Sequence, residues 1–353
     1  MENTIKKGLG FMDDPQLKNN SDVLREVVPS QGDSPSARHL GPADKPQDYS
    51  PLNIRLALQL AAPHTWPAAI LPVLFATALA SVSTHAVSVT LVLALLLICI
   101  LMQASVNTIN DYYDFMKGTD TQDNQDDPTD AVLVYNRVDP RFVLYLALGF
   151  LGIAFVLGGY VIFCSGWIPL VIGFAGAVII LLYSAGKSPI SYLPIGELVS
   201  GITMGALIPL ACFQALTGIF DWQVLLLALP FILGIGLIML TNNTCDIEKD
   251  IVAGRKTLSV LLKRKRARCA YHGILFFWIA AIVTLVAFFF TKGLIVMPFM
   301  VLICYPVLQG LLKNPLTVNT RGAAMPQCLN INIALGTFYI AAILFSSGIT
   351  VLL

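Results

Sequence analysis

The sequence predicts an all-α protein: a polytopic membrane helical bundle of about nine transmembrane helices. Of its 353 residues, 56% are hydrophobic and only 12% are charged, whereas roughly a quarter are charged in ordinary soluble domains. The apolar residues also gather in runs close to the roughly 20 residues that a spanning helix needs. Such runs are too long for the strands of a membrane barrel, so helices are the way to satisfy the backbone groups in lipid.

The chain divides into a polar tail and one membrane domain. Residues 1–50 contain no apolar run of spanning length and many Ser, Pro and Asp residues, so we expect a disordered tail there and a transmembrane domain over residues 51–353. The tail has no basic segment followed by an apolar one, which argues against a cleaved signal peptide. Nine apolar stretches predict the spanning helices: residues 56–80, 86–109, 142–163, 167–183, 195–216, 223–241, 270–291, 294–311 and 329–352.

The basic residues predict how these helices are oriented. If the loops alternate between the two sides of the membrane, 21 of the 22 Lys and Arg residues lie on one side and only Lys292 lies on the other. Loops that keep positive charge stay in the cytoplasm. We therefore expect a cytoplasmic N-terminus and, with an odd number of spans, a C-terminus on the opposite side.

Amide and carboxylate side chains gather at the end of the second stretch, at intervals of four, three, one and three residues: Gln103, Asn107, Asn110, Asp111 and Asp114. At about 3.6 residues per turn they lie along one stripe of a helix. The loop that follows adds Asp120. The end of the sixth stretch repeats the pattern with Asn242, Asn243, Asp246 and Asp250. This repetition indicates an internal duplication.

Carboxylates on one helix face repel each other unless a cation neutralises them. Oxygen ligands without a Cys or His ligand spacing favour Mg²⁺ over zinc or copper, and Mg²⁺ commonly bridges one or two carboxylates to the phosphates of a substrate. A phosphorylated ligand is therefore implied. Basic residues expected on the same membrane side could hold the rest of a diphosphate's charge: Lys117, Lys187, Arg255 and Lys256.

These two motifs resemble those of the UbiA superfamily of intramembrane aromatic prenyltransferases. Residues 110–120 are most similar to the first motif of its menaquinone branch, the MenA-type 1,4-dihydroxy-2-naphthoate polyprenyltransferases. The paired asparagines, Asp246, Asp250 and the basic segment 253–258 are similar to the second motif of that branch. Tyr183, Lys187 and the segment 196–198 fall where the family carries comparable residues.

The resemblance implies Mg²⁺-dependent transfer of a polyprenyl group from a polyprenyl diphosphate to an aromatic acceptor such as 1,4-dihydroxy-2-naphthoate, in menaquinone biosynthesis. It implies an enzyme in the inner or plasma membrane, with the lipid bilayer as its surroundings, the active site facing the cytoplasm and no nucleic acid as a partner. The expected metal ligands are Asp111, Asp114, Asp120, Asp246 and Asp250, with Asn110 and Asn243. The expected substrate contacts are Asn107, Asn110, Lys117, Lys187, Asn242, Asn243, Arg255 and Lys256, and Tyr183 would stabilise the allylic cation or position the ring.

Three alternatives remain at this point. The acceptor could be another aromatic acid, 4-hydroxybenzoate or homogentisate. A CDP-alcohol phosphotransferase also uses clustered aspartates, but its continuous aspartate motif is absent. A cation-coupled transporter would place its carboxylates near the middle of the bilayer, whereas these aspartates lie at helix ends.

Overall fold

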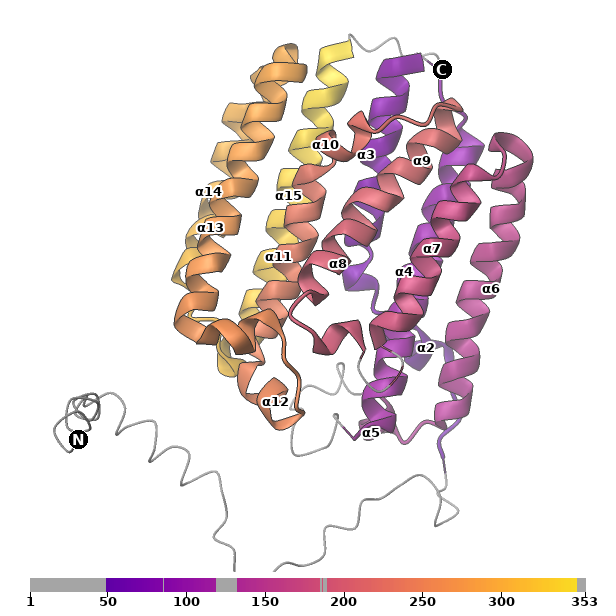
Figure 1. Ribbon diagram of the computed structural model, residues 1–353, viewed down its shortest axis with the longest axis vertical. Coiled ribbons are helices and arrows are strands. Elements are labelled where there is room, and N and C mark those ends of the chain that lie inside the picture. The colour runs from indigo at the N-terminus through magenta and orange to yellow at the C-terminus, as the bar shows by residue number, and fades with distance from the viewer. Residues whose placement is uncertain (1–48, 85, 119–131, 185, 187–188, 348–353) are drawn as a thin grey trace, which may run out of the picture. The chain divides into compact units, whose positions relative to one another are not determined.

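The structure is a computed structural model that describes residues 49–84, 86–118, 132–184, 186 and 189–347. The predicted tail lies outside these residues except for its last two positions, Tyr49 and Ser50. The described part consists of helices joined by short connections and contains no β-strand, which confirms the all-α class. In Figure 1 the long helices lie side by side, with α13–α15 on one flank of the bundle and α4, α6 and α7 on the other.

Seven of the described helical segments are long and apolar enough to cross a membrane: α3 (Pro67–Thr84), α4 (Val89–Met116), α6 (Pro140–Ser165), the segment Gly196–Thr217, α13 (Leu258–Phe289), the segment Thr291–Lys313, and the segment Val318–Ser346. Two shorter apolar helices, α7 (Ile168–Ser184) and α11 (Leu229–Cys245), lie where the fourth and sixth stretches are predicted. The protein is thus a multi-pass membrane protein. The count of nine spans and the cytoplasmic N-terminus stay predictions.

Three of the long segments are composite. The segment Gly196–Thr217 contains α8 (Gly196–Ile202), a π-helical turn, η3 (Thr203–Leu207), and α9 (Ile208–Thr217). The 3-10 turn η4 (Thr291–Val296) precedes α14 (Met297–Lys313), and η5 (Val318–Thr320) precedes α15 (Arg321–Ser347). Within α13 the backbone is non-helical at Lys263 (φ 61°, ψ 156°).

The first predicted span begins differently in the structure. Residues 54–61 form a separate short helix, α2 (Ile54–Ala61), and the chain turns at Ala62, passes through a 3-10 turn at Pro63–Thr65 and begins α3 at Pro67. Proline lacks an N–H and is best accommodated in the first turn of a helix. Pro63 and Pro67 begin the 3-10 turn and α3, where the stretch divides.

Helix α2 is secured against α4. The Asn107 amide donates to the carbonyl of Ala61 (3.0 Å), and the Thr108 hydroxyl donates to the carbonyl of Leu60 (3.3 Å). These bonds satisfy carbonyl groups that the end of α2 leaves without helical partners. Helix α2 therefore lies beside the first aspartate motif.

Short helices mark the ends of the bundle. At the end that carries the aspartates, Figure 1 shows α2, α5 (Val132–Asn136) and α12 (Ile247–Val252). The 3-10 turn η2 (Ile190–Tyr192) precedes α8, and α10 (Gln223–Leu227) precedes α11.

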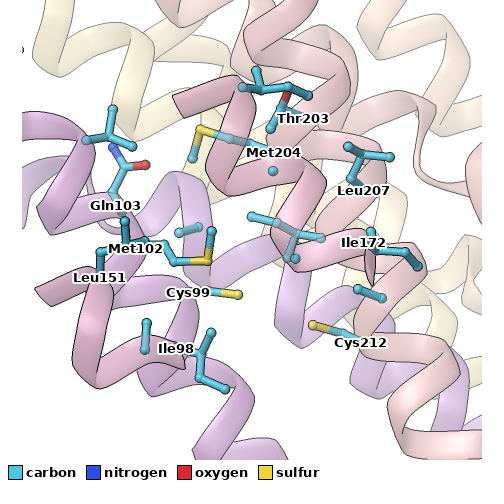
Figure 2. A pocket seen from close by; sticks show the side chains of 18 of the residues that line it. Ile98, Cys99, Met102, Gln103, Leu151, Ile172, Thr203, Met204, Leu207 and Cys212 are labelled. Carbon is cyan, nitrogen blue, oxygen red and sulfur yellow. The ribbon is translucent and has the colours of Figure 1, made fainter. Parts of the chain in front are cut away.

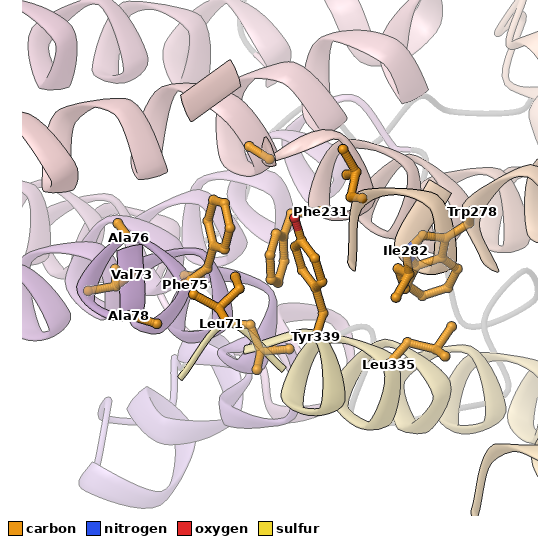
Figure 3. Close-up of a cluster of buried hydrophobic side chains, with 14 of the residues drawn as sticks. Leu71, Val73, Phe75, Ala76, Ala78, Phe231, Trp278, Ile282, Leu335 and Tyr339 are labelled. Atoms are coloured by element: carbon orange, nitrogen blue, oxygen red, sulfur yellow. The ribbon is translucent and has the colours of Figure 1, made fainter. Parts of the chain in front are cut away.

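The core contains an aromatic cluster that joins helices from both halves of the chain (Figure 3). Phe75 of α3 packs against Phe231 of α11, with ring centroids 4.9 Å apart, and against Tyr339 of α15, at 5.7 Å. The buried Tyr339 hydroxyl donates to the Leu227 carbonyl (2.9 Å), as an aromatic hydroxyl in an apolar core requires. Large apolar side chains remain exposed on the outer faces of the helices, as expected for contact with lipid: Val156, Phe163, Phe276, Phe288 and Leu302.

Two glycines bring α8 and η3 close to α11. A Cβ atom added to Gly205 would lie 2.4 Å from the backbone nitrogen of Ile232, and one added to Gly201 would lie 2.6 Å from its carbonyl oxygen. Only glycine permits backbones to approach so closely. This contact sets the beginning of α8 beside the second aspartate motif at the end of α11.

Candidate active site

The first motif lies on α4, which continues to Met116 and therefore carries Asn107, Asn110, Asp111 and Asp114 on one continuous helix, as predicted. The end of α7 lies beside it. The Ser184 hydroxyl donates to the Asn110 side-chain carbonyl, and the Lys117 ammonium donates to the Ser184 backbone carbonyl (2.8 Å). These bonds couple the first motif to the helix that carries Tyr183.

The second motif spans a helix junction. Helix α11 ends at Cys245, and Asp246 occupies the junction (φ −100°, ψ 18°) before α12 begins at Ile247. The Asp250 N–H still donates to the Asp246 carbonyl (2.8 Å), so the chain keeps one helical turn between the two aspartates. The single continuous helix implied by the spacing is thus replaced by two helices that present both carboxylates at the same end of the bundle.

Arg255 joins the two motifs. Its Nη2 atom lies 2.8 Å from Asp114 Oδ1, and its Nη1 atom lies 3.7 Å from Asp250 Oδ1. The guanidinium also packs over the ring of Tyr192, 4.8 Å from its centroid, while the Lys117 ammonium lies 5.0 Å from the same ring. One aromatic side chain therefore separates and orients two of the predicted diphosphate contacts.

Burial and the neighbouring charges shift the pKa values of Asp250 and Arg255. Burial raises the pKa of Asp250 to about 6, against the opposing effects of the Arg255 guanidinium and of the Thr257 hydroxyl, which donates to Asp250 Oδ2 (3.1 Å). Burial also opposes the charge on Arg255, but Asp114 and Asp250 outweigh it and raise its pKa above the ordinary value. Only 5% of the Asp250 side chain is exposed, so a positive group beside it is needed to hold its charge.

A second arginine forms an ion pair with Asp246, the other aspartate of the second motif. Arg321, the first residue of α15, places Nε 3.1 Å from Asp246 Oδ2 and donates from Nη2 to the Asn242 side-chain carbonyl (2.9 Å). The sequence prediction did not include Arg321 in the site. A single arginine at the start of an apolar span was its only signal, and membrane sorting explains that signal equally well.

A third acidic residue is buried beside the second motif. Glu197, in the first turn of α8, is 6% exposed, and its Oε1 atom accepts a hydrogen bond from the Asn243 amide (2.8 Å). Its Oε2 atom is buried without a hydrogen-bond partner among the described residues. The sequence prediction did not include Glu197, although it lies in the 196–198 segment that resembles the family.

The remaining predicted residues are distributed as follows. Lys256 is exposed, and its backbone N–H donates to the Tyr192 carbonyl (2.8 Å). Asp111 is half-buried on α4. Asp120 and Lys187 lie outside the described residues.

An apolar cavity of about 230 Å³ begins at the first motif and runs between α4, α6, α7 and the segment from α8 to α9 (Figure 2). Asn107, Asn110 and Tyr183 line its motif end, and Cys99, Leu95 and Cys212 line its far part. None of the described residues that line it is charged. The cavity therefore adjoins the first motif through Asn107 and Asn110, and its described lining is uncharged.

The side chains at this site offer oxygen donors, the ligand type that a divalent metal such as Mg²⁺ takes. Among the described residues, no three Asp, Glu, His or Cys side chains are close enough to hold a metal ion by themselves. Arg255 nevertheless brings oxygen donors from both motifs to one place, and Mg²⁺ typically takes one or two carboxylates and completes its shell with water and substrate phosphates.

The fold and the site together define a multi-pass membrane protein that carries a cluster of charged side chains beside an apolar cavity. Residues 69–321 match the UbiA prenyltransferase family, and the chain belongs to that family. It is an aromatic prenyltransferase, as the motifs predicted.

Two bacterial relatives have the function that the menaquinone-branch motifs suggest. The chain is 38% identical over 228 residues to 1,4-dihydroxy-2-naphthoate octaprenyltransferase of Bacillus subtilis (strain 168), covering 64% of this chain and 72% of the relative. It is 31% identical over 260 residues to the Mycobacterium tuberculosis (strain ATCC 25618 / H37Rv) protein of the same name, covering 71% and 85%.

Solved structures share the fold. An apo UbiA homologue from Aeropyrum pernix K1 superposes with a TM-score of 0.57 at 16% identity, covering 78% of this chain and 96% of that one. A UbiA homologue from Archaeoglobus fulgidus bound to DMAPP and Mg²⁺ superposes with a TM-score of 0.52 at 17% identity, covering 80% and 98%.

Proposed function

We propose that this protein transfers a polyprenyl group from its diphosphate to 1,4-dihydroxy-2-naphthoate, with Mg²⁺, at the cytoplasmic face of the cell inner membrane or plasma membrane. The observation that supports the proposal is the combination of the Arg255 site with the cavity. Both aspartate motifs meet Arg255, and Asn107 and Asn110 of the first motif line a cavity whose described lining is uncharged. A polyprenyl diphosphate has the same division, with a charged head and an apolar chain.

The residues take the following roles. Asp111, Asp114, Asp246 and Asp250 hold the metal, with Asn110 and Asn243 as neutral oxygen ligands or orienting groups, and Asp120 and Lys187 remain candidates from the sequence. Arg255, Lys117 and Lys256 bind diphosphate oxygens. When bound, the metal neutralises charge on the departing diphosphate. The allylic C–O bond breaks, a ring carbon of the acceptor forms the new C–C bond, and the acceptor's carboxyl group leaves as CO₂.

Tyr183 and the cavity protect the reacting carbon. Tyr183 lines the cavity at its motif end, where the face of its ring can stabilise an allylic cation. The apolar walls exclude the water that would otherwise capture such a cation. A long prenyl chain continues from the cavity into lipid between the helices.

The lining also favours the naphthoate over 4-hydroxybenzoate. Both acids enter with a carboxylate, but a prenylated 4-hydroxybenzoate keeps it, and the product's charge would have to be stabilised among uncharged side chains. The dihydroxynaphthoate loses its carboxylate in the reaction, and its second ring adds apolar surface. The names of the bacterial relatives point to the same acceptor.

The acceptor can be tested with the full-length protein in detergent. We expect purified protein with Mg²⁺ and a polyprenyl diphosphate to consume 1,4-dihydroxy-2-naphthoate and to release CO₂ and diphosphate in equal amounts. 4-Hydroxybenzoate and homogentisate complete the panel. Turnover of 4-hydroxybenzoate with none of the naphthoate would refute the proposed acceptor but not the enzyme class.

Metal removal should abolish the reaction. Carboxylates alone repel a diphosphate, so EDTA should stop diphosphate release and added Mg²⁺ should restore it. Binding of the prenyl diphosphate, measured by its protection of the protein against thermal unfolding, should fall in parallel. Full activity in excess EDTA would contradict the assignment of the aspartates to a metal.

A further inference from the structure

The polar residues that line the cavity form two groups. Asn107, Asn110 and Tyr183 belong to the motif end described above. Deeper in the cavity, Gln103 of α4 faces the segment of Ser200 and Thr203, which belong to α8 and η3. Figure 2 shows Gln103 and Thr203 reaching the cavity from two different walls, among apolar side chains such as Met102 and Leu207.

Thr203 differs from other helical threonines of this protein. The hydroxyls of Thr77, Thr108, Thr217 and Thr241 each donate to the carbonyl four residues earlier, at 2.7–2.8 Å. That bond is the usual way for a threonine to satisfy its hydroxyl inside a helix. The Thr203 Oγ1 atom is buried and has no hydrogen-bond partner among the described residues.

The threonine without the usual hydroxyl bond lies in the π-helical turn η3. Thr203 is its first residue, and isolated π turns within α-helices are frequent at functional sites. Two residues later, Gly205 packs directly against the backbone of α11. The close packing holds this turn in place, so Thr203 stays at the cavity wall.

Gln103 on the facing wall is held in one orientation. Its Nε2 atom donates to Thr65 Oγ1 and to Asn107 Oδ1, both at 3.3 Å. The amide nitrogen is therefore occupied, and none of the described residues donates to the amide oxygen. The two walls thus carry a hydroxyl and a carbonyl oxygen that have no hydrogen-bond donor or acceptor partner among the described residues.

A prenyl chain has no polar atom that could pair with either group, so the polar partner belongs to the other substrate. Gln103 precedes Asp111 by eight residues, or about 12 Å along a helix that rises 1.5 Å per residue. An aromatic ring between them can direct its reacting carbon to the motif end and its hydroxyl groups to the deeper walls.

On the basis of the proposed function, we infer that Thr203 and Gln103 form the acceptor subsite and recognise ring hydroxyl groups of a hydroquinone-type aromatic substrate. The recognition uses neutral hydrogen bonds, because no charged residue lines this part of the cavity among those described. Thr203 donates to or accepts from a ring hydroxyl, and Gln103 accepts from one.

The test is Thr203→Val, which keeps the shape of the side chain and removes its hydroxyl. We expect the KM for 1,4-dihydroxy-2-naphthoate to rise by about tenfold or more, with an unchanged KM for the prenyl diphosphate. Thermal stability should stay equal or increase, because a buried hydroxyl without a protein partner is removed. Thr203→Ser, which retains a hydroxyl, should keep a KM for the acceptor near that of the wild type.

One control variant and two further measurements make the result specific. Thr77→Val makes the same change at a helical threonine whose hydroxyl bonds its own helix, and it should leave both KM values unchanged. Gln103→Leu should raise the KM for the acceptor as Thr203→Val does. An acceptor analogue with one ring hydroxyl replaced by hydrogen should lose most of the difference between wild type and one of these two variants.

The outcomes separate the two proposals. If wild-type protein turns over an aromatic acceptor and Thr203→Val changes neither KM value, the subsite is wrong and the proposed function stands. A rise in the KM for the prenyl diphosphate alone would also overturn the subsite, because it would place the prenyl chain at Thr203. If the wild type transfers a prenyl group to no aromatic acceptor, both proposals fail.

Discussion

Asp250→Asn should lower turnover by about 10³-fold or more while the protein remains folded. Asp250 is buried, accepts a hydrogen bond from Thr257 and lies beside Arg255. The amide keeps the size of the side chain but removes the charge that a divalent metal requires. Initial rates of diphosphate release, together with thermal unfolding in detergent, measure the two effects separately.

Glu248→Gln is the matched control, since it makes the same chemical change two residues away in α12. The Glu248 side chain is 64% exposed and pairs with Arg264 at 2.6 Å, and exposed pairs contribute only about 0–1 kcal/mol. This variant should keep most of its activity. Near-normal turnover in a well-folded Asp250→Asn protein would show that the second motif is structural.

The loss of turnover caused by Asp250→Asn should not add to the loss caused by a substitution in the first motif. Asp114→Asn should also abolish turnover, and the double variant should be about as inactive as either single one, because groups that act as one catalytic unit are strongly non-additive. The Arg255 bridge between the two aspartates is the structural reason for this expectation. Additive losses in the double variant would indicate that the motifs act independently.

The second large effect is expected for Arg255→Met. Turnover should fall by about 10²–10³-fold, because a preorganised cation is lost where diphosphate charge develops. The thermal unfolding temperature in EDTA should also fall, since the buried Asp250 loses the cation beside it. Added Mg²⁺ should recover part of the stability, because a metal can neutralise the same carboxylates, but should recover little of the activity.

Lys265→Met controls for the change in net charge, because Lys265 is exposed on α13, away from both motifs in sequence. It should resemble the wild type in rate and in stability. The proposed role of Arg255 would be refuted by an Arg255→Met protein with unchanged diphosphate release.

The helices and the first motif were accessible from the sequence because each depends on residues close together in the chain. The apolar stretches correspond to helical segments in the structure, since hydropathy and length decide locally whether a segment can lie in lipid. The stripe from Asn107 to Asp114 followed from the helical period alone. The division of residues 54–84 into two helices also had a local signal, Pro63 and Pro67. The high hydropathy of the whole stretch hid that signal.

The contacts within the site were decided by the tertiary structure. Arg255 and Asp114 are 141 residues apart, Arg321 and Asp246 are 75 apart, and Asn243 and Glu197 are 46 apart. Arg255 was expected at the site from the segment that follows Asp250, but no local pattern shows which carboxylates it pairs with. Nothing local distinguishes Arg321 from a basic residue that anchors a helix end among headgroups. Their pairing depends on which helices pack together, and here the close approach at Gly201 and Gly205 places α8 against α11.

The sequence by itself therefore determined that this protein spans a membrane and carries two oxygen-rich motifs, because hydrophobicity and helical period are properties of neighbouring residues. Only the tertiary structure decided that both motifs meet at Arg255, that an uncharged cavity adjoins them and that Thr203 faces this cavity without a hydrogen-bond partner in the described protein. Each of these features depends on the packing of helices distant in sequence, which close contacts such as that of Gly205 with Ile232 determine.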